Sequence, residues 1–358
     1  MTILWLNLII VFTFSFFARY FATKSSTSLT PVGIKPNKIL TFGALASLVA
    51  TAGLRSNIGD TFNYKNIYVE NDFTWEYIFS QKDYGFGILQ MVLKNYITDD
   101  PQIMIFTAAL ITNVLIVIVF YNYSRFIELS LYVYITGGLF LVSMNGIRQV
   151  LAASIAFIAI RFLINGNFIK YSLIILFAST FHQSALVLIP IYFLVRFKAW
   201  SKTTVVVIIF AVLAVLGFEQ FSNLLFIALE DTQYSDYENF DEGGSNILRT
   251  LVAIVPLFIA YLGRQKLKII FPDSDYIVNM AILGFVFMLI STQWWIFARV
   301  SIYFELYHLI LISWIVKLFS KKDGRILYYG ILSCYLLYYY YENVINLNII
   351  YRSNFLTW

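Results

Sequence analysis

Five polar residues stand out against an apolar background and could do chemistry: Arg55, Asp60, Arg148, His182 and Arg299. Arg148 is the most conspicuous, because it lies between the apolar runs 131–144 and 151–160. A charged side chain at bilayer depth costs roughly 2.5–3.5 kcal/mol on insertion scales. Arg148 therefore either faces a polar cavity and holds an anion, or marks a helix boundary from which it reaches the lipid head groups.

Arginine suits anion binding because its planar guanidinium matches two phosphate or carboxylate oxygens and stays protonated. Arg55, Arg148 and Arg299 are thus candidates for binding a diphosphate on a lipid carrier, with the amide of Gln149 beside Arg148. The alternative for each arginine is anchoring at the membrane boundary. Because basic residues are disfavoured on the outer side of membranes, that alternative weakens if all three lie there.

Proton transfer needs a different group, and His182 is one of only two histidines in the chain. An ordinary pKa of about 6.5 suits histidine to act as a base. Asp60 is the alternative base, or an acceptor of a sugar hydroxyl. The structural alternatives are a hydrogen bond at a helix end for His182 and a local ion pair or turn after Gly59 for Asp60.

Aromatic side chains are frequent over residues 62–86, and Tyr64 is the candidate among them for packing against a sugar ring. An aromatic belt at the membrane interface explains the same pattern equally well. With two histidines and one cysteine, we expect no metal cluster and no cofactor. Glycine-rich phosphate loops, H-E-x-x-H and G-x-S-x-G are missing from the sequence, which argues against ATP-driven transport and against zinc or serine proteolysis.

The composition predicts an integral membrane protein. Of 358 residues, 60% are hydrophobic and 13% are charged, whereas soluble domains carry about 25% charged residues. Repeated apolar runs of about 17–25 residues are typical of membrane-spanning helices. We therefore predict an all-α bundle of about twelve (10–14) transmembrane segments, forming a single membrane domain over residues 1–358.

The charges of the loops predict the sidedness. Residues 19–38 carry four basic side chains and no acidic one, which places this loop in the cytoplasm. Residues 55–101 carry four basic and seven acidic side chains, and 230–246 is acidic, so both are predicted outside. Nucleic acid is not an expected partner, because the net charge of +5 is spread over the loops. Counting spans from these loops places all five polar residues at the outer face.

Three segments near the polar residues have predicted helix boundaries. Residues 128–144 are expected to form one span, and Tyr84–Ile97 an interfacial or re-entrant helix. Residues 171–195 are expected to form a pair of short helices that break near Phe181-His182-Gln183-Ser184, since that break keeps the following cations in the cytoplasm. Non-helical backbone at membrane depth is tolerated only within protein or beside a polar cavity, which puts His182 at the same cavity as Arg148.

Several motifs occur in an order that resembles a known family. They are Arg55-x4-Asp60-x3-Tyr64, Gly146-Ile147-Arg148-Gln149-x-Leu151-Ala152, Phe181-His182-Gln183-Ser184-Ala185-Leu186 with Pro190, and Ala298-Arg299-x3-Tyr303-Phe304. Together they resemble the EpsG family of exopolysaccharide polymerases, relatives of the Wzy polymerases, over roughly residues 1–320. The first motif commonly reads Gly-Thr-Asp, whereas this chain has Ile58-Gly59-Asp60-Thr61.

This resemblance implies a GT-C-like fold and polymerisation of repeat units carried on undecaprenyl diphosphate at the outer face of the bacterial cytoplasmic membrane. It implies no nucleotide sugar and no metal. Arg148 and Arg299 would bind diphosphate with help from Arg55, and His182 or Asp60 would act as the base. Membrane lipids and other exopolysaccharide export or flippase proteins are further expected partners. A flippase of lipid-linked sugars, a membrane O-acyltransferase and a structural membrane subunit are the competing functions.

Overall fold

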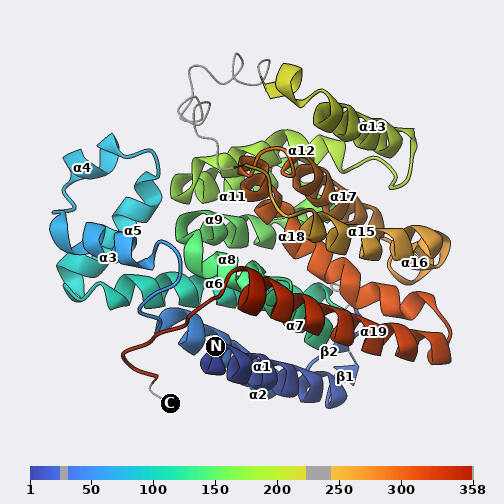
Figure 1. Ribbon diagram of the computed structural model, residues 1–358, viewed down its shortest axis with the longest axis horizontal. Coiled ribbons are helices and arrows are strands. Elements are labelled where there is room, and N and C mark those ends of the chain that lie inside the picture. The colour runs from blue at the N-terminus through green and yellow to red at the C-terminus, as the bar shows by residue number, and fades with distance from the viewer. Residues whose placement is uncertain (25–30, 223–242, 357–358) are drawn as a thin grey trace. The chain divides into compact units, whose positions relative to one another are not determined.

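The computed structural model describes residues 1–24, 31–222 and 243–356 (Figure 1). Of the described residues, 77% are helical and almost none are in strands, which confirms the all-α prediction. A short antiparallel pair, β1 (Thr23–Lys24) with β2 (Ile34–Lys35), is the exception within the described ranges. Most of the predicted outer segment 230–246 lies outside the described residues.

The chain divides into two compact units, of which the first comprises residues 1–192 and 312–358. The predicted single membrane domain stays a prediction. Unit 1 contains α1 (Thr2–Tyr20), α2 (Lys38–Gly53), α3 (Thr61–Glu70), α4 (Trp75–Ser80), α5 (Tyr84–Tyr96), α6 (Gln102–Tyr123), α7 (Ile127–Thr136), α8 (Leu139–Asn145), α9 (Ile147–Ile158), α10 (Ile160–Ile164), α11 (Phe168–Phe181), η1 (Gln183–Val187), η3 (Val316–Leu318), α19 (Lys321–Tyr339) and the π-helix η4 (Tyr340–Asn346).

The second unit comprises residues 193–311, and the boundaries between the units fall inside two helices, α12 (Leu188–Leu194) and α18 (Ile296–Ile315). Its other described helices are α13 (Lys202–Leu216), α15 (Ile247–Leu262), α16 (Arg264–Ile270) and α17 (Ser274–Ile290).

Three helices are long and apolar enough to cross a membrane: α1, α6, and α18 continued through η3. Two bent pairs raise this number to five in the described part of the chain, namely α7 with α8 and α15 with α16. Further apolar helices of 10–17 residues are shorter. These helices fit a membrane protein, whereas the number of about twelve spans and the GT-C fold stay predictions.

Two predicted helix boundaries can be compared directly with the structure. His182 is extended (φ −158°, ψ 116°) and ends α11, so the break predicted near residue 182 is confirmed. The span predicted over 128–144 consists of two helices, α7 and α8, which meet at an angle of 56°. Gly138, with φ 94°, makes this bend possible, since a side chain would strain the backbone in that conformation.

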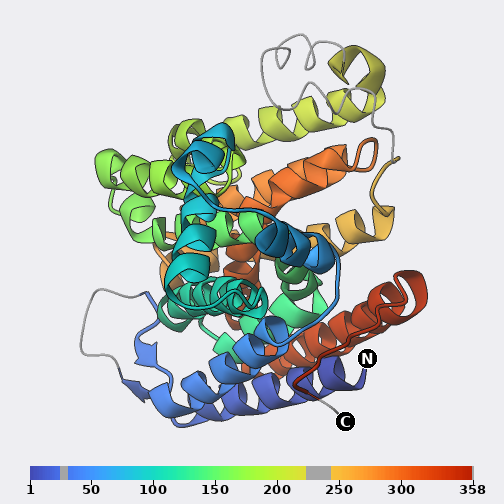
Figure 2. The ribbon, with the colours of Figure 1, turned by 90° about the vertical axis from the view of Figure 1, so that its left-hand side faces the viewer.

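The helices of unit 1 have two distinguishable ends. At one end, the Arg55 end, the side-chain amide of Gln102 at the start of α6 donates to Gly53 O at the end of α2 (2.6 Å). At the other, the Arg19 end, Asn37 N donates to Ala18 O (2.8 Å), which joins the start of α2 to the end of α1. Figure 2 shows α1 and α2 side by side. With 22 residues at about 1.5 Å each, α6 separates the two ends by about 33 Å.

Candidate functional site

The carboxylate of Asp83 joins three segments of unit 1 at the Arg55 end. Asp83 directly precedes α5 and is buried. One of its oxygens, Oδ2, lies 2.9 Å from Nη1 of Arg148 at the start of α9. The other, Oδ1, accepts a hydrogen bond from the backbone N–H of Gln183 (3.2 Å) and lies 3.7 Å from Nδ1 of His182. We call Tyr64, Asp83, Arg148 and His182 the Asp83 cluster.

Arg148 is fixed on two sides within this cluster but remains accessible. Besides the ion pair with Asp83, its Nε donates to the hydroxyl of Tyr64 (3.2 Å), and its guanidinium lies 5.9 Å from the centre of that ring. Tyr64 in turn packs edge-to-face on Phe86. The side chain of Arg148 is 46% exposed. A cation in the first turn of a helix is disfavoured by the helix dipole, so Asp83 supplies the charge that stabilises it there.

His182 lies at the break between α11 and η1, where its side chain is about one-fifth exposed. Its Nδ1 is buried and has no hydrogen-bond partner among the described residues. The distance of 3.7 Å to Asp83 is too long for a hydrogen bond. Contacts of catalytic bases are often long without substrate and tighten in the substrate complex. The geometry is thus that of an imidazole next to the carboxylate that would orient it.

Glycine at position 85 allows α5 to approach α11 next to the cluster. A Cβ atom on Gly85 would lie 2.2 Å from Oγ1 and 2.9 Å from the carbonyl oxygen of Thr180. Contacts this short to backbone cannot be relieved by a rotamer change alone. Because Gly85 lies two residues after Asp83 and Thr180 two residues before His182, this close approach holds the carboxylate near the imidazole.

Arg55 is buried at the same end of unit 1, with 1% of its surface exposed. Its Nη2 donates to Met144 O (2.7 Å), its Nε to Thr61 Oγ1 (3.0 Å), and its Nη1 to Ala52 O. Burial lowers the pKa of Arg55 to about 9, so the group is still a cation at neutral pH. These bonds join the ends of α2 and α8 to the start of α3, which makes Arg55 a positioning residue in this structure.

The remaining predicted site residues lie in three different surroundings. Asp60 is exposed at the start of α3, and its backbone N–H donates to Oδ1 of Asn145 (3.1 Å), the last residue of α8. Gln149 is buried in α9. Arg299 belongs to the second unit, where its guanidinium lies 4.8 Å from the ring centre of Trp295. Its convergence with the Asp83 cluster stays a prediction.

Sequence reasoning missed Asp83, the residue that connects the cluster. The available signal was its position, a single acidic residue immediately before the apolar helix predicted from Tyr84. An acid there usually suggests helix capping, but Asp83 makes no side-chain cap bond to its own helix. Among the described residues, no three or more His, Cys, Asp or Glu side chains are grouped so as to hold a metal ion.

The long apolar helices fit a helical membrane protein. The Asp83 cluster is a partly exposed polar site at one end of the helices of unit 1. The chain belongs to the EpsG family, whose family model matches residues 38–355, and this confirms the resemblance noted from the motifs. The family supports an exopolysaccharide polymerase-like role and, in general, a glycosyltransferase-type activity. Searches of curated proteins and of solved structures found no match.

Proposed function

We propose that this protein polymerises exopolysaccharide repeat units that are carried on undecaprenyl diphosphate. The observation that supports this proposal best is the Asp83 cluster, in which an accessible arginine and a histidine share one buried carboxylate. Arg148 has the charge and geometry to bind a diphosphate, and His182 can accept a proton. A cation that binds the leaving diphosphate and a group that accepts the hydroxyl proton both suit glycosyl transfer from a lipid diphosphate.

In the proposed step, a hydroxyl oxygen of the incoming repeat unit forms a bond to the anomeric carbon of the growing chain. The bond from that carbon to the diphosphate oxygen breaks, and the hydroxyl proton passes to His182. The lipid diphosphate leaves with increased negative charge, so a cation at Arg148 stabilises the transition state more than the ground state. Asp83 orients the imidazole and holds Arg148. Asp60 is the second candidate for the base, and Gln149 and Arg299 are candidates for binding substrate.

We place this site at the outer face of the cytoplasmic membrane. The support is the distribution of charge along unit 1, in which Arg19 and Arg125 lie at the opposite end of α6 from the Asp83 cluster. Loops rich in arginine and lysine favour the cytoplasm. The length of α6, about 33 Å, is comparable with the hydrocarbon thickness of a bilayer, about 30 Å.

We expect Arg148→Ala and His182→Ala to leave the protein folded and inserted but to abolish chain extension. Loss of a charge that binds the leaving group or of the base typically costs about 100- to 1,000-fold in rate. The measurement incubates purified protein with defined oligosaccharides on undecaprenyl diphosphate and determines product length by mass spectrometry. Asp60→Asn in the same assay tests the alternative base.

Normal product length in both alanine variants would contradict the proposal. Translocation of the lipid-linked substrate across vesicles, without a longer product, would identify a flippase instead. Consumption of an acyl donor with transfer to the polysaccharide would identify an O-acyltransferase.

The close approach of α5 to α11 gives a further prediction. We expect Gly85→Ala to reduce chain extension about 10- to 100-fold, because the added methyl group pushes Asp83 away from His182 and small displacements in a site are costly. Gly87→Ala is the matched control on the same helix, since its Cβ would lie at an ordinary distance of 3.4 Å from Ile78. Equal rates for the two variants would contradict this role of Gly85.

A further inference from the structure

A basic cavity lies at the Arg19 end of unit 1, away from the Asp83 cluster. Its volume is about 420 Å³, and the ends of α1 and η3 and the first turns of α19 contribute to its wall. Cavities of about 300–1,000 Å³ are typical of small-ligand sites. The motifs and the proposed polymerase mechanism make no use of this cavity.

The charge of the cavity wall is positive. Four basic side chains line it, Arg19, Lys317, Lys321 and Arg325, and no acidic side chain is among the lining residues. Ser320, Lys321 and Gly324 at the start of α19 also line it, and a helix N-terminus favours an anion. The neighbouring Arg125 is affected by the same positive charge: burial is the main cause that lowers its pKa, and the charge of Arg19 lowers it further.

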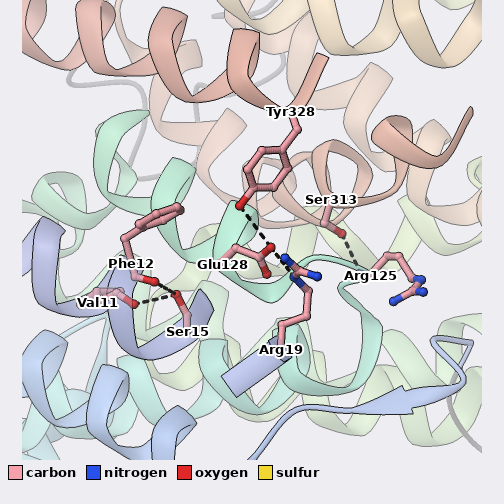
Figure 3. Close-up of polar contacts among 8 residues, drawn as sticks. All are labelled: Val11, Phe12, Ser15, Arg19, Arg125, Glu128, Ser313 and Tyr328. Atoms are coloured by element: carbon pink, nitrogen blue, oxygen red, sulfur yellow. Dashed lines mark hydrogen bonds and ion pairs between the residues drawn. The ribbon is translucent and has the colours of Figure 1, made fainter. Parts of the chain in front are cut away.

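The position of Arg19 in this wall is fixed by a buried carboxylate. Arg19 Nε forms an ion pair with Glu128 Oε1, and the hydroxyl of Tyr328 donates to the same oxygen at 3.3 Å (Figure 3). The guanidinium also lies 4.9 Å from the ring centre of Phe126. Glu128 is fully buried. Its carboxylate pairs with Arg19 and does not line the cavity.

Apolar side chains occupy the rest of the wall. Phe16, Phe126 and Phe319 line the cavity together with Tyr328 and Tyr329. An inorganic anion would use only the cations, whereas an amphiphile with a charged head and acyl chains would contact both kinds of surface. The combination of basic and aromatic side chains therefore favours a lipid over a small soluble anion.

The cavity lies where apolar helices end. Two helices that can cross a membrane, α1 and α6, have their C-termini at the Arg19 end, and α18 reaches it through η3. The indole Nε1 of Trp314 in α18 donates to Tyr123 O at the end of α6 (2.8 Å), and Arg125 N donates to Ser313 Oγ (3.0 Å). Basic pockets at helix ends are typical binding sites for anionic lipid head groups.

We propose that this cavity binds the phosphate head group of an anionic membrane lipid. Lys321 and Arg325 on α19 bind the phosphate oxygens with Arg19 and Lys317, and the aromatic side chains contact the glycerol and the first acyl carbons. The site lies about one bilayer thickness from the Asp83 cluster, so its ligand is distinct from the substrate that is proposed to react there.

The test measures lipid binding to the delipidated full-length protein in detergent by native mass spectrometry. The probes are phosphatidylglycerol, phosphatidylcholine with the same acyl chains, and water-soluble glycerol 3-phosphate. Each basic side chain near a head group contributes about fivefold in affinity. We therefore expect Lys321→Gln combined with Arg325→Gln to weaken phosphatidylglycerol binding about 25-fold. The matched control is Lys24→Gln combined with Lys322→Gln, which removes the same charge from exposed residues outside the cavity wall.

Selective binding of phosphatidylglycerol that the cavity variant loses and the control variant keeps would support the proposal. Equal binding of phosphatidylcholine, or an equal loss in both double variants, would overturn it. Binding of glycerol 3-phosphate as tight as that of the lipid would overturn the assignment to a lipid and identify a soluble phosphate ester instead. Thermal unfolding of each variant shows whether it is folded, and chain extension is not needed for any of these readings.

Discussion

Asp83→Asn is expected to reduce the rate of chain extension at least about 100-fold, although Asp83 is proposed to position other groups rather than to touch the substrate. The amide can still accept the hydrogen bond from Gln183 N but carries no charge. Arg148 then loses its ion pair, and His182 loses the carboxylate that orients it. The measurement is the initial rate of product lengthening, with the thermal midpoint in detergent as the test of folding.

The matched control is Asp72→Asn, which makes the same chemical change at an exposed position in the same polar segment. We expect this variant to retain its rate within about twofold, as is usual for surface substitutions.

A positioning role of Asp83 also predicts how its substitution combines with that of His182. If Asp83 acts through Arg148 and His182, the rate loss of the double variant Asp83→Asn/His182→Ala is smaller than the product of the two single losses, because residues that act as a unit are not additive. Independent, multiplying losses would contradict that role.

Features of the fold could be predicted where a short contiguous stretch of sequence determines them. The helices and the break at His182 were predictable because apolar runs and their loop charges are written in contiguous sequence. The bend between α7 and α8 was missed, although Gly137 and Gly138 are adjacent, because two glycines inside an apolar run also fit a continuous transmembrane helix. Whether such a pair bends depends on packing against other helices, which no local pattern contains.

The predictability of the site was limited in a different way. Arg148 and His182 were found because a cation and an imidazole are conspicuous among apolar residues. Asp83 lies in a segment with six other acidic residues, so its residue type alone does not single it out as a site residue. Only the fold shows that it lies beside Arg148. For Arg55 the type of residue predicted anion binding, but its guanidinium is buried among neutral oxygens of unit 1. Residue type identifies what a group can bind, and only the fold decides which partner it meets.

Arg55→Ala is expected to be the most destabilising of the single substitutions considered. It removes the donors to Ala52 O, Met144 O and Thr61 Oγ1 in a site that is 1% exposed. Each buried acceptor left without a donor costs about 1–3 kcal/mol, and the vacated volume adds to the loss. We expect a loss of about 3–5 kcal/mol in the free energy of unfolding, at the upper end of single substitutions. The measurement is thermal unfolding of the wild type and the variant in detergent, in which the loss of stability appears as a lower midpoint temperature of the variant.

Arg55→Lys separates this positioning role from diphosphate binding. Lysine keeps the positive charge but lacks the planar fork that reaches three acceptors in fixed directions. If Arg55 positions α2, α3 and α8, this variant unfolds at a lower temperature than the wild type, and any loss of chain extension follows the loss of folded protein. If Arg55 instead binds diphosphate, folded Arg55→Lys protein has a normal thermal midpoint and a weaker affinity for the lipid-linked substrate. Because Arg55 donates to backbone oxygens at the ends of two helices, we expect the first result.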